Sequence, residues 1–327
     1  MKTLVLSMIS IAATVAAMTA CTSESDPIND ITNPKDAKTP IEFASSIIGV
    51  QTKAMNSEAT KFDANDEIAI TMYKGNAEPQ NAELGTPAKS NVKFIVGDDQ
   101  TKLSEKAAEK TMFWDRNNKH YFYAYYPIAA SDANYTYTAA SGSSAEKITV
   151  TVPADGKTTD LLMGKISSGL SFSGTAVENA NIQFSHKLSK INFVFIKDKS
   201  YQGAANLTAI SLNIANSSVS IDLVSQTATL GGSPMDITKS SLNKVIDENA
   251  TGTIFTDWSP IVTPGTTINT LKLTIDGKEI ESQNLTATLK GGSITKITIT
   301  LKGSGITELT TGITDWANDV EGSGDII

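Results

Sequence analysis

The stretch Asn181–Ile196 reads NIQFSHKLSKINFVFI and carries the strongest strand pattern in the chain. Its apolar and polar residues alternate, but Ile182 and Phe184 lie at even positions whereas Phe193 and Phe195 lie at odd positions. Alternation with a period of two predicts strands that bury one face. The change of phase predicts a β-bulge or a bend, where one extra residue shifts the side that faces the core. We take this stretch as the start of a second domain.

Short strands separated by turn residues are expected on the C-terminal side of this stretch. Asp276-Gly277, between LKLTI and KEI, is a two-residue hairpin signal, and Gly231-Gly232 and Gly291-Gly292 mark further turns. Several short strands with regular turn signals predict an all-β sandwich. The expected strands are Leu207–Ile214, Val219–Val224, Thr227–Leu230, Leu271–Ile275, Leu285–Leu289 and Ile294–Leu301.

The N-terminal side also has a strand pattern, interrupted once by helix-forming residues. Met112–Pro127 (MFWDRNNKHYFYAYYP) places aromatic rings on both faces of a strand, which is typical of a large core and less often of a site that stacks sugar rings. Leu103–Lys110 (LSEKAAEK) has no strong apolar stripe and predicts a short helix or a loop. The other strands expected here are Asp66–Tyr73, Val92–Val96 and Ile148–Val152.

The stretch Ile41–Ala54 (IEFASSIIGVQTKA) predicts a first strand with a cleavage site behind it. Ile41, Phe43 and Ile47 alternate with other residues on one face, and Lys53-Ala54 is a trypsin-like site. If this is an edge strand, its removal after folding would leave an apolar groove and unpaired backbone groups, which invite another strand. The alternative is an ordinary first strand of a sandwich followed by an exposed lysine.

The first residues predict export and attachment to a membrane. Met1–Ala20 has the basic start, apolar run and small residues of a secretory signal peptide, and its apolar part is short for a membrane span. The residues before Cys21 resemble the bacterial lipobox, in which cleavage leaves an acylated cysteine at the new N-terminus. More than one acyl chain gives firm anchoring. Residues 21–40 are polar and proline-punctuated, which predicts a flexible tether.

Charge and residue counts exclude several classes of function. The formal net charge is -8 and the pI is about 4.9, which argues against a nucleic-acid partner because that contact needs clustered cations. One cysteine, Cys21, allows no disulfide within the chain and no thiolate metal site. We expect His120 to be solvated at a turn and His186 to be hydrogen-bonded within a strand. With no phosphate-binding loop and no zinc spacing, we predict no catalytic residue, no metal site and no cofactor.

The tail that follows Leu301 carries a second set of apolar residues. We expect two short strands here, which either complete the preceding domain or fill a groove in a neighbouring subunit. Burial of four or five such side chains at about 1.5–3 kcal/mol each would compete with the loss of the first strand. The candidate donor residues are Ile306, Leu309, Ile313, Trp316 and Val320.

In the order of these segments, the chain resembles the fimbrillin family, the Mfa-like lipoprotein subunits of type V pili in Bacteroides-like bacteria. The resemblance covers nearly the whole chain. It rests on the signal peptide with Cys21, the early IEF…TKA segment, YFYAYYP, DLLMG, FSHKLSKINFVFI and the terminal ITDWANDVEGSGD.

The family resemblance implies a fold and a path of assembly. The expected fold is two tandem transthyretin-like β-sandwiches, at residues 41–180 and 181–327, after the signal peptide and the tether. The precursor would be lipid-anchored at the outer membrane and cell surface, trimmed by a protease that cleaves after arginine or lysine, and joined to other pilin subunits by donor-strand exchange. The cleavage would fall between Lys53 and Ala54, where the family more often has arginine. The resulting fimbriae would support adhesion to a host or bacterial receptor.

A surface lipoprotein that never polymerises remains the alternative. It would keep Cys21 and its first strand and would bind a glycan or a host protein. The candidate stacking residues are Tyr121, Tyr123, Tyr126 and Trp258, and nothing in the sequence distinguishes them from core residues.

Overall fold

The computed structural model describes residues 39–48, 61–172, 180–282, 285, 287–303 and 305–315. In these ranges the chain is built from β-strands, with two short 3-10 turns, η2 (Asn81–Gly85) and η3 (Ala129–Ser131), and no α-helix. Abundant β-branched residues favour this outcome, because they pack well on a pleated surface. The all-β expectation is therefore confirmed. None of the helical turns in the described ranges has the length and apolar character to cross a bilayer.

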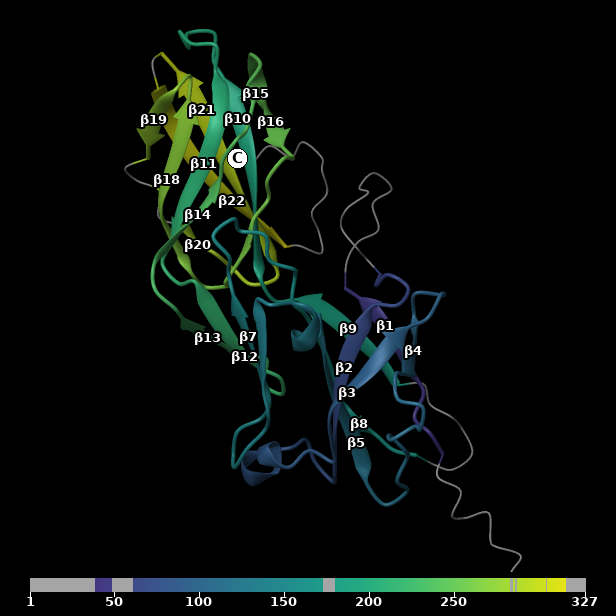
Figure 1. The fold of residues 1–327 in the computed structure, drawn as a ribbon. Coiled ribbons are helices and arrows are strands. Elements are labelled where there is room, and N and C mark those ends of the chain that lie inside the picture. The colour runs from purple at the N-terminus through teal and green to yellow at the C-terminus, as the bar shows by residue number, and fades with distance from the viewer. Residues whose placement is uncertain are drawn as a thin grey trace, which may run out of the picture. The chain divides into compact units, whose positions relative to one another are not determined.

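The N-terminal strands close into a barrel in the order β1-β4-β3-β2-β5-β8-β9 (Figure 1). The neighbouring strands are antiparallel except for β1 and β9, which are parallel and close the barrel. The helix or loop expected at Leu103–Lys110 is wrong in its first half, because β4 lies there and buries Leu103. The strands are β1 (Phe43–Ile47), β2 (Glu67–Gly75), β3 (Lys89–Val96), β4 (Lys102–Glu105), β5 (Lys119–Tyr126), β8 (Leu162–Leu170) and β9 (Ala180–His186).

A second sheet packs on part of the outer face of the barrel. Its order is β13-β12-β7-β6, from β6 (Tyr135–Thr138), β7 (Lys147–Thr151), β12 (Ser218–Asp222) and β13 (Ala228–Gly231). Outward-facing tyrosines of β5 share one buried cluster with apolar residues of β7 and β12. Strands from before and after residue 181 therefore meet in this sheet, while the division of the chain into two domains at that residue stays a prediction.

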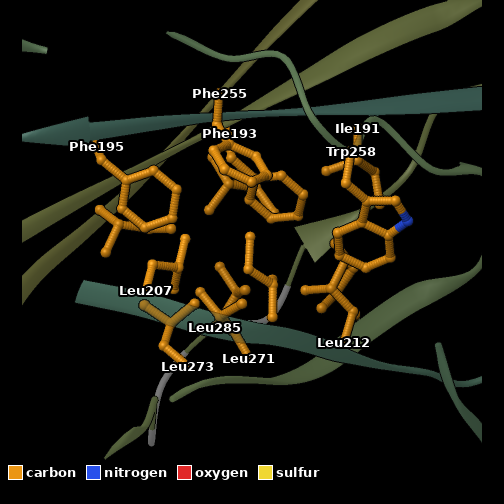
Figure 2. Close-up of a cluster of buried hydrophobic side chains, with 14 of the residues drawn as sticks. Ile191, Phe193, Phe195, Leu207, Leu212, Phe255, Trp258, Leu271, Leu273 and Leu285 are labelled. Atoms are coloured by element: carbon orange, nitrogen blue, oxygen red, sulfur yellow. The ribbon is translucent and has the colours of Figure 1, made fainter. Parts of the chain in front are cut away.

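The C-terminal strands form two sheets that face each other across a single core. Figure 2 shows this core, in which the rings of Phe193 and Trp258 stack at a centroid distance of 5.5 Å. One sheet has the order β16-β10-β21-β22 with β17 beside β10, from β10 (Ser189–Lys197), β16 (Asn249–Phe255), β17 (Ile261–Val262), β21 (Ser293–Lys302) and β22 (Gly305–Asp315). The other has the order β14-β11-β18-β19, from β11 (Asn206–Ile214), β14 (Met235–Lys239), β18 (Thr267–Ile275) and β19 (Lys278–Glu281), with β15 (Lys244–Val245) beside β11 and β20 (Ala287–Thr288) beside β18.

The stretch NIQFSHKLSKINFVFI is two strands that belong to different sheets. β9 places Ile182 and Phe184 in the barrel core, whereas β10 places Phe193 and Phe195 in the core of the C-terminal sheets. The expected bulge or bend within one strand is therefore wrong. The phase changes because the chain leaves one sheet after His186 and starts another at Ser189, so a different face becomes the buried one.

The hairpin expected at Asp276-Gly277 is confirmed between β18 and β19. Ile275 pairs with Lys278, and the two turn residues have φ angles of 51° and 73°. Positive φ at both central residues defines the type I′ turn that suits the twist of two antiparallel strands. The Asp276 carboxylate also accepts hydrogen bonds from the backbone N–H of Asn206 at 2.9 Å and of Ala205 at 3.1 Å.

Candidate functional site: the first strand and its slot

The first strand has a hydrogen-bonded neighbour on each side. β1 runs parallel to β9 from the pair Phe43–Ala180 to the pair Ile47–Phe184, and antiparallel to β4 at Phe43–Leu103 (Figure 1). The expectation of an edge strand is therefore wrong. Alternation in the sequence shows that one face is buried but does not reveal that closure of the barrel supplies a second neighbour.

The backbone of β1 is tied to both neighbours by short hydrogen bonds. On the β4 side, the Ser45 N–H donates to the Thr101 carbonyl oxygen at 2.8 Å. On the β9 side, the Ala180 N–H donates to the Glu42 backbone carbonyl oxygen at 2.9 Å. The Ile48 N–H donates to the Phe184 backbone carbonyl oxygen at 2.8 Å. We call the space between β4 and β9 that β1 occupies the slot.

The inward side chains of β1 are part of the barrel core. Ile41, Phe43 and Ile47 are buried together, as the sequence predicted for their common face. The Phe43 ring packs edge-on against Phe94 and against Phe122, each with a centroid distance of 5.0 Å. Such aromatic contacts add to the hydrophobic gain from burial.

Ser45 is a residue of the slot that the sequence reasoning missed. It is 3% exposed, and its Oγ donates to the Thr101 carbonyl oxygen at 3.2 Å. Its place between Phe43 and Ile47 on the same parity was the signal that could have identified it. The slot thus takes an aromatic ring, a small hydroxyl and an aliphatic side chain at alternate positions.

Residues 112–114 hold the segment that leads into β1. The Trp114 N–H donates to the Thr39 oxygen at 2.9 Å, and the Ile41 N–H donates to the Met112 oxygen at 3.1 Å. Between these bonds, Pro40 and Phe113 form an antiparallel bridge. We call this arrangement the clamp.

His120 lies beneath the clamp, and the expectation that it is solvated is wrong. The residue is fully buried on β5 because it faces Trp114, whose ring packs edge-on at 5.0 Å. Its Nε2 accepts a hydrogen bond from the Asp115 N–H at 3.0 Å. Burial holds the pKa of His120 below its usual value, and the Lys74 ammonium acts in the same direction.

His186 is hydrogen-bonded at the end of a strand, as expected. Its Nδ1 contacts the Asp160 carboxylate, and burial raises the pKa of Asp160 although the His186 interaction acts against that rise. Across the residues that the structure describes, no group of three or more His, Cys, Asp or Glu side chains is arranged to hold a metal ion.

The aromatic side chains considered as a ligand-binding platform lie in cores. Tyr121, Tyr123 and Trp258 are at most 3% exposed, and Tyr126 is half-buried against the barrel core. The Trp258 Nε1–H donates to the Asp155 backbone carbonyl oxygen at 2.9 Å, so the polar group of this buried indole has a hydrogen-bond partner. The core interpretation of these rings is therefore confirmed.

The described part of the tail forms one strand, β22, and the second of the two expected strands, around Trp316 and Val320, lies outside the described residues. β22 pairs antiparallel with β21 along its length, with Ile306 opposite Leu301, Leu309 opposite Ile299, and an irregularity in register between these pairs. β22 is the last strand of its sheet within the described ranges, and Ile313 is 54% exposed.

Five of the predicted site residues lie outside the described residues. These are the acylation site Cys21, the cleavage site Lys53-Ala54, and the tail residues Trp316 and Val320. Their roles stay predictions, as do the roles of the described residues in strand exchange.

Comparison with known proteins connects this arrangement to one family. Residues 52–316 match the family described as Fimbrillin-like. No curated protein matches the chain. Crystal structures of other proteins share its fold, among them three from Bacteroides species.

The first of these structures is a proposed cell adhesion protein from Bacteroides ovatus, with a TM-score of 0.60, 17% sequence identity, and coverage of 86% of this chain and 98% of the other. A proposed cell adhesion protein from Bacteroides uniformis has a TM-score of 0.55 and 20% identity, with 87% and 100% covered. A fimbrial protein from Bacteroides vulgatus has a TM-score of 0.56 and 16% identity, with 84% and 99% covered.

Proposed function

This chain belongs to the fimbrillin-like family, and from that premise we propose that it is a structural subunit of cell-surface fimbriae that polymerises by exchange of β1 for a strand of another subunit. The observation that carries the proposal is the place of β1 in the barrel. The strand is short, fills a slot between two strand edges, and precedes a basic cleavage site in the sequence. The product would support adhesion, in keeping with the cell adhesion and fimbrial proteins that share its fold.

The proposal includes two transthyretin-like β-sandwich domains. The C-terminal pair of sheets around one core supports the second sandwich. The barrel and the β13-β12-β7-β6 sheet, which share a buried cluster, support the first. We propose residues 41–180 and 181–327 as their approximate extents.

Loss of β1 would create a strong site for another strand. Cleavage between Lys53 and Ala54 would cut the link between β1 and β2, so β1 would be held in the barrel by noncovalent contacts alone. Its departure would leave unpaired backbone groups on both β4 and β9 and would expose Phe94 and Phe122. Unpaired strand edges and exposed apolar surface both favour pairing with a new strand.

The tail of a second subunit is the donor that we propose. β22 is already extended, ends its sheet in the described part of the chain, and exposes Ile313. At alternate positions, Leu309–Ile313 (LTTGI) repeats the order apolar, hydroxyl, apolar that Phe43, Ser45 and Ile47 present to the slot. Trp316 and Val320 would extend the contact, and Ile306 would lie before it.

The route to the surface follows from the first residues of the chain. The signal peptide Met1–Ala20 would direct export, and acylated Cys21 would anchor the precursor at the outer membrane through the tether of residues 21–40. A protease specific for basic residues would then free the subunit from its anchor. The partners would be other pilin subunits, the processing protease and a receptor on a host or bacterial cell.

A Lys53→Ala variant tests the proposal. We expect it to accumulate as a folded monomer that begins at acylated Cys21, whereas the native chain forms polymers that begin at Ala54. Denaturing gels of surface fractions, run with and without strong heating, would show a heat-sensitive ladder only for the native chain, and mass spectrometry would identify each N-terminus.

A Lys61→Ala variant is the matched control, because Lys61 is an exposed lysine on the other side of the proposed cleavage site. It should polymerise normally. Assembled native protein that still begins at acylated Cys21 would overturn the proposal and favour a monomeric surface lipoprotein.

A further inference from the structure

The clamp holds the chain at the point where β1 begins. Its two hydrogen bonds and the Pro40–Phe113 bridge join residues 39–41 to residues 112–114, which are distant in the sequence. For β1 to leave the slot, this clamp must open as well as the ladders to β4 and β9. The position of residues 112–114 therefore bears directly on the release of β1.

His120 supports the clamp through its unprotonated Nε2. The N–H of Asp115, the residue after the clamp, donates to that nitrogen at 3.0 Å, so Nε2 must carry a lone pair. The proton of the neutral ring is then on Nδ1. A second proton would have to go onto Nε2, where it would point at the Asp115 N–H and abolish the hydrogen bond.

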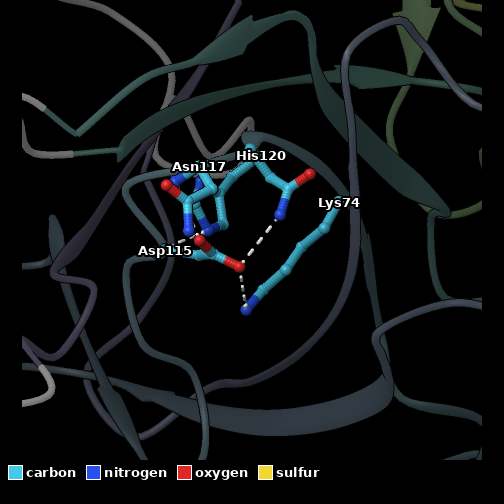
Figure 3. Close-up of polar contacts among 5 residues, drawn as sticks. Lys74, Asp115, Asn117 and His120 are labelled. Carbon is cyan, nitrogen blue, oxygen red and sulfur yellow. Dashed lines mark hydrogen bonds and ion pairs between the residues drawn. The ribbon is translucent and has the colours of Figure 1, made fainter.

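Charged groups around His120 come from two elements and oppose each other. Lys74, its partner in register on β2, disfavours a charged ring, whereas the Asp115 carboxylate favours one. Figure 3 shows Lys74 beside Asp115. The Lys74 ammonium lies 3.8 Å from the Asp115 Oδ2, which also accepts a hydrogen bond from the Asn118 amide at 3.0 Å. The Asn117 N–H donates to Oδ1 at 2.9 Å. Because these groups already contact the Asp115 carboxylate, it cannot serve as the sole partner of a charged His120 ring.

Two further elements enclose the ring. Leu170, opposite His120 on β8, has a backbone carbonyl that favours the charged ring, although Nδ1 makes no hydrogen bond of normal geometry in the described part of the chain. On the other side, the Trp114 ring separates His120 from Phe172, which stacks on Trp114 at 5.8 Å and lies under the Arg116 guanidinium at 5.6 Å. A buried ring in this setting has little access to water when it takes up a proton.

We propose that His120 is an acid-operated latch on the first strand: the neutral ring holds the clamp closed, and a proton on Nε2 opens it and frees the chain that leads into β1. The inference rests on the proposed function, because it describes how release of β1 is regulated. Acid would thus promote the exchange of β1, while neutral conditions would keep an unassembled subunit closed.

The direction of the pH dependence follows from the state of the ring. Burial and Lys74 place the pKa of His120 in the closed clamp below the ordinary value of about 6.5 that it regains when the clamp opens. The closed clamp is therefore fully stabilised at pH values above the ordinary pKa. That stabilisation is lost as the pH falls toward the lower pKa that His120 has in the closed clamp. Between these two pKa values, the equilibrium constant for opening of the clamp rises about tenfold for each unit by which the pH falls.

Hydrogen exchange in the full-length monomer at about pH 7 and pH 5 tests the latch. The reporters are the amides of Ile41, Trp114 and Asp115, which are the donors of the clamp and its support. After correction for intrinsic exchange, their protection should be lower at about pH 5 than at about pH 7, by as much as about tenfold for each pH unit below the ordinary pKa of about 6.5. The Ala215 amide, which donates to Thr267 in the C-terminal sheets, should keep its protection and so exclude global unfolding.

Three variants separate the latch from a merely structural role of the ring. A His120→Gln change keeps an acceptor that does not titrate, so the reporter amides should respond to pH less than about twofold. A Lys74→Gln change removes a charge that lowers the pKa of His120 in the closed clamp, so the gap to the ordinary pKa narrows and the reporter amides should lose less protection in acid than in the native protein. His186→Gln alters the other histidine of the chain and should leave the response as it is in the native protein.

Equal protection at both pH values in the native chain, or an undiminished response in His120→Gln, would overturn the latch. Its failure is distinguishable from failure of the proposed function, because the exchange measurement uses a monomer and needs no polymer. A chain that polymerises although its clamp is indifferent to acid refutes the latch alone. A clamp that opens in acid in a chain that never polymerises refutes the proposed assembly and leaves the latch in place.

Discussion

β1 and β22, the first and last strands described, are held in opposite ways. β1 spans Phe43–Ile47, has a hydrogen-bonded neighbour on each side, and buries its inward side chains in the barrel. β22 spans Gly305–Asp315, pairs with β21 alone in the described ranges, and leaves Ile313 exposed. The shorter strand therefore depends on side-chain burial and on closure of the barrel, and the longer one depends on its backbone ladder.

This difference shows why the two strands suit the two sides of an exchange. A strand held by burial leaves a specific and costly vacancy when it departs, since apolar surface and backbone groups on two edges lose their partners. A strand at the end of a sheet has one neighbour, so among the described strands only the ladder to β21 must open before β22 can move. In the proposed assembly, the vacancy left by β1 supplies the driving force and β22 supplies an accessible strand.

The largest effect is expected from Phe43→Ala in the uncleaved chain. Loss of a ring packed between Phe94 and Phe122 should lower the free energy of unfolding by about 3–5 kcal/mol. The matched change in β22, Ile313→Ala, removes a side chain that is already 54% exposed and should cost less than about 0.5 kcal/mol. Chemical denaturation of both variants measures the contrast, and equal losses would break the comparison between the strands.

A smaller effect is expected from Ser45→Ala. The change removes the bond from Oγ to the Thr101 oxygen, which still accepts the Ser45 N–H, so the free energy of unfolding should fall by about 1 kcal/mol. Thr311→Val removes a hydroxyl from an exposed position of β22 and should change stability by no more than about 0.5 kcal/mol. The same denaturation series reports both, and a Ser45→Ala variant as stable as the native chain would show that the hydroxyl position does not select the strand.

The smallest effect is expected from Asp99→Asn, next to the β4 side of the slot. The Asp99 carboxylate accepts from the backbone N–H of Lys102 at 2.8 Å and of Thr101 at 3.0 Å, and these bonds lower the pKa of Asp99. A carboxyl group whose pKa is lower in the folded than in the unfolded protein stabilises the fold at pH values above its unfolded pKa. This stabilisation is lost as the pH falls through its folded pKa. The difference in stability between the native chain and Asp99→Asn should therefore shrink from neutral pH to about pH 3. A difference that grows on acidification would contradict this assignment.

Local structure was largely predictable from the sequence. The alternation in Asp66–Tyr73 and Leu207–Ile214 identified β2 and β11, and Asp276-Gly277 identified a hairpin, because a strand pattern and a turn residue act on their immediate neighbours. The common face of Ile41, Phe43 and Ile47 was also visible, since side chains two apart in a strand point the same way.

Tertiary structure alone decided which segments meet. The pairing of Phe43 with Ala180, the hydrogen bond from Trp114 to Thr39 and the burial of His120 join residues that are far apart in the chain or change the surroundings of a turn. A periodic pattern reports that a face is buried but does not name what buries it. The sequence by itself thus determined an all-β chain whose first strand precedes a candidate cleavage site. Closure of the barrel made that strand an inner one, because a strand at the end of a sheet acquires its second neighbour only when the sheet closes on itself.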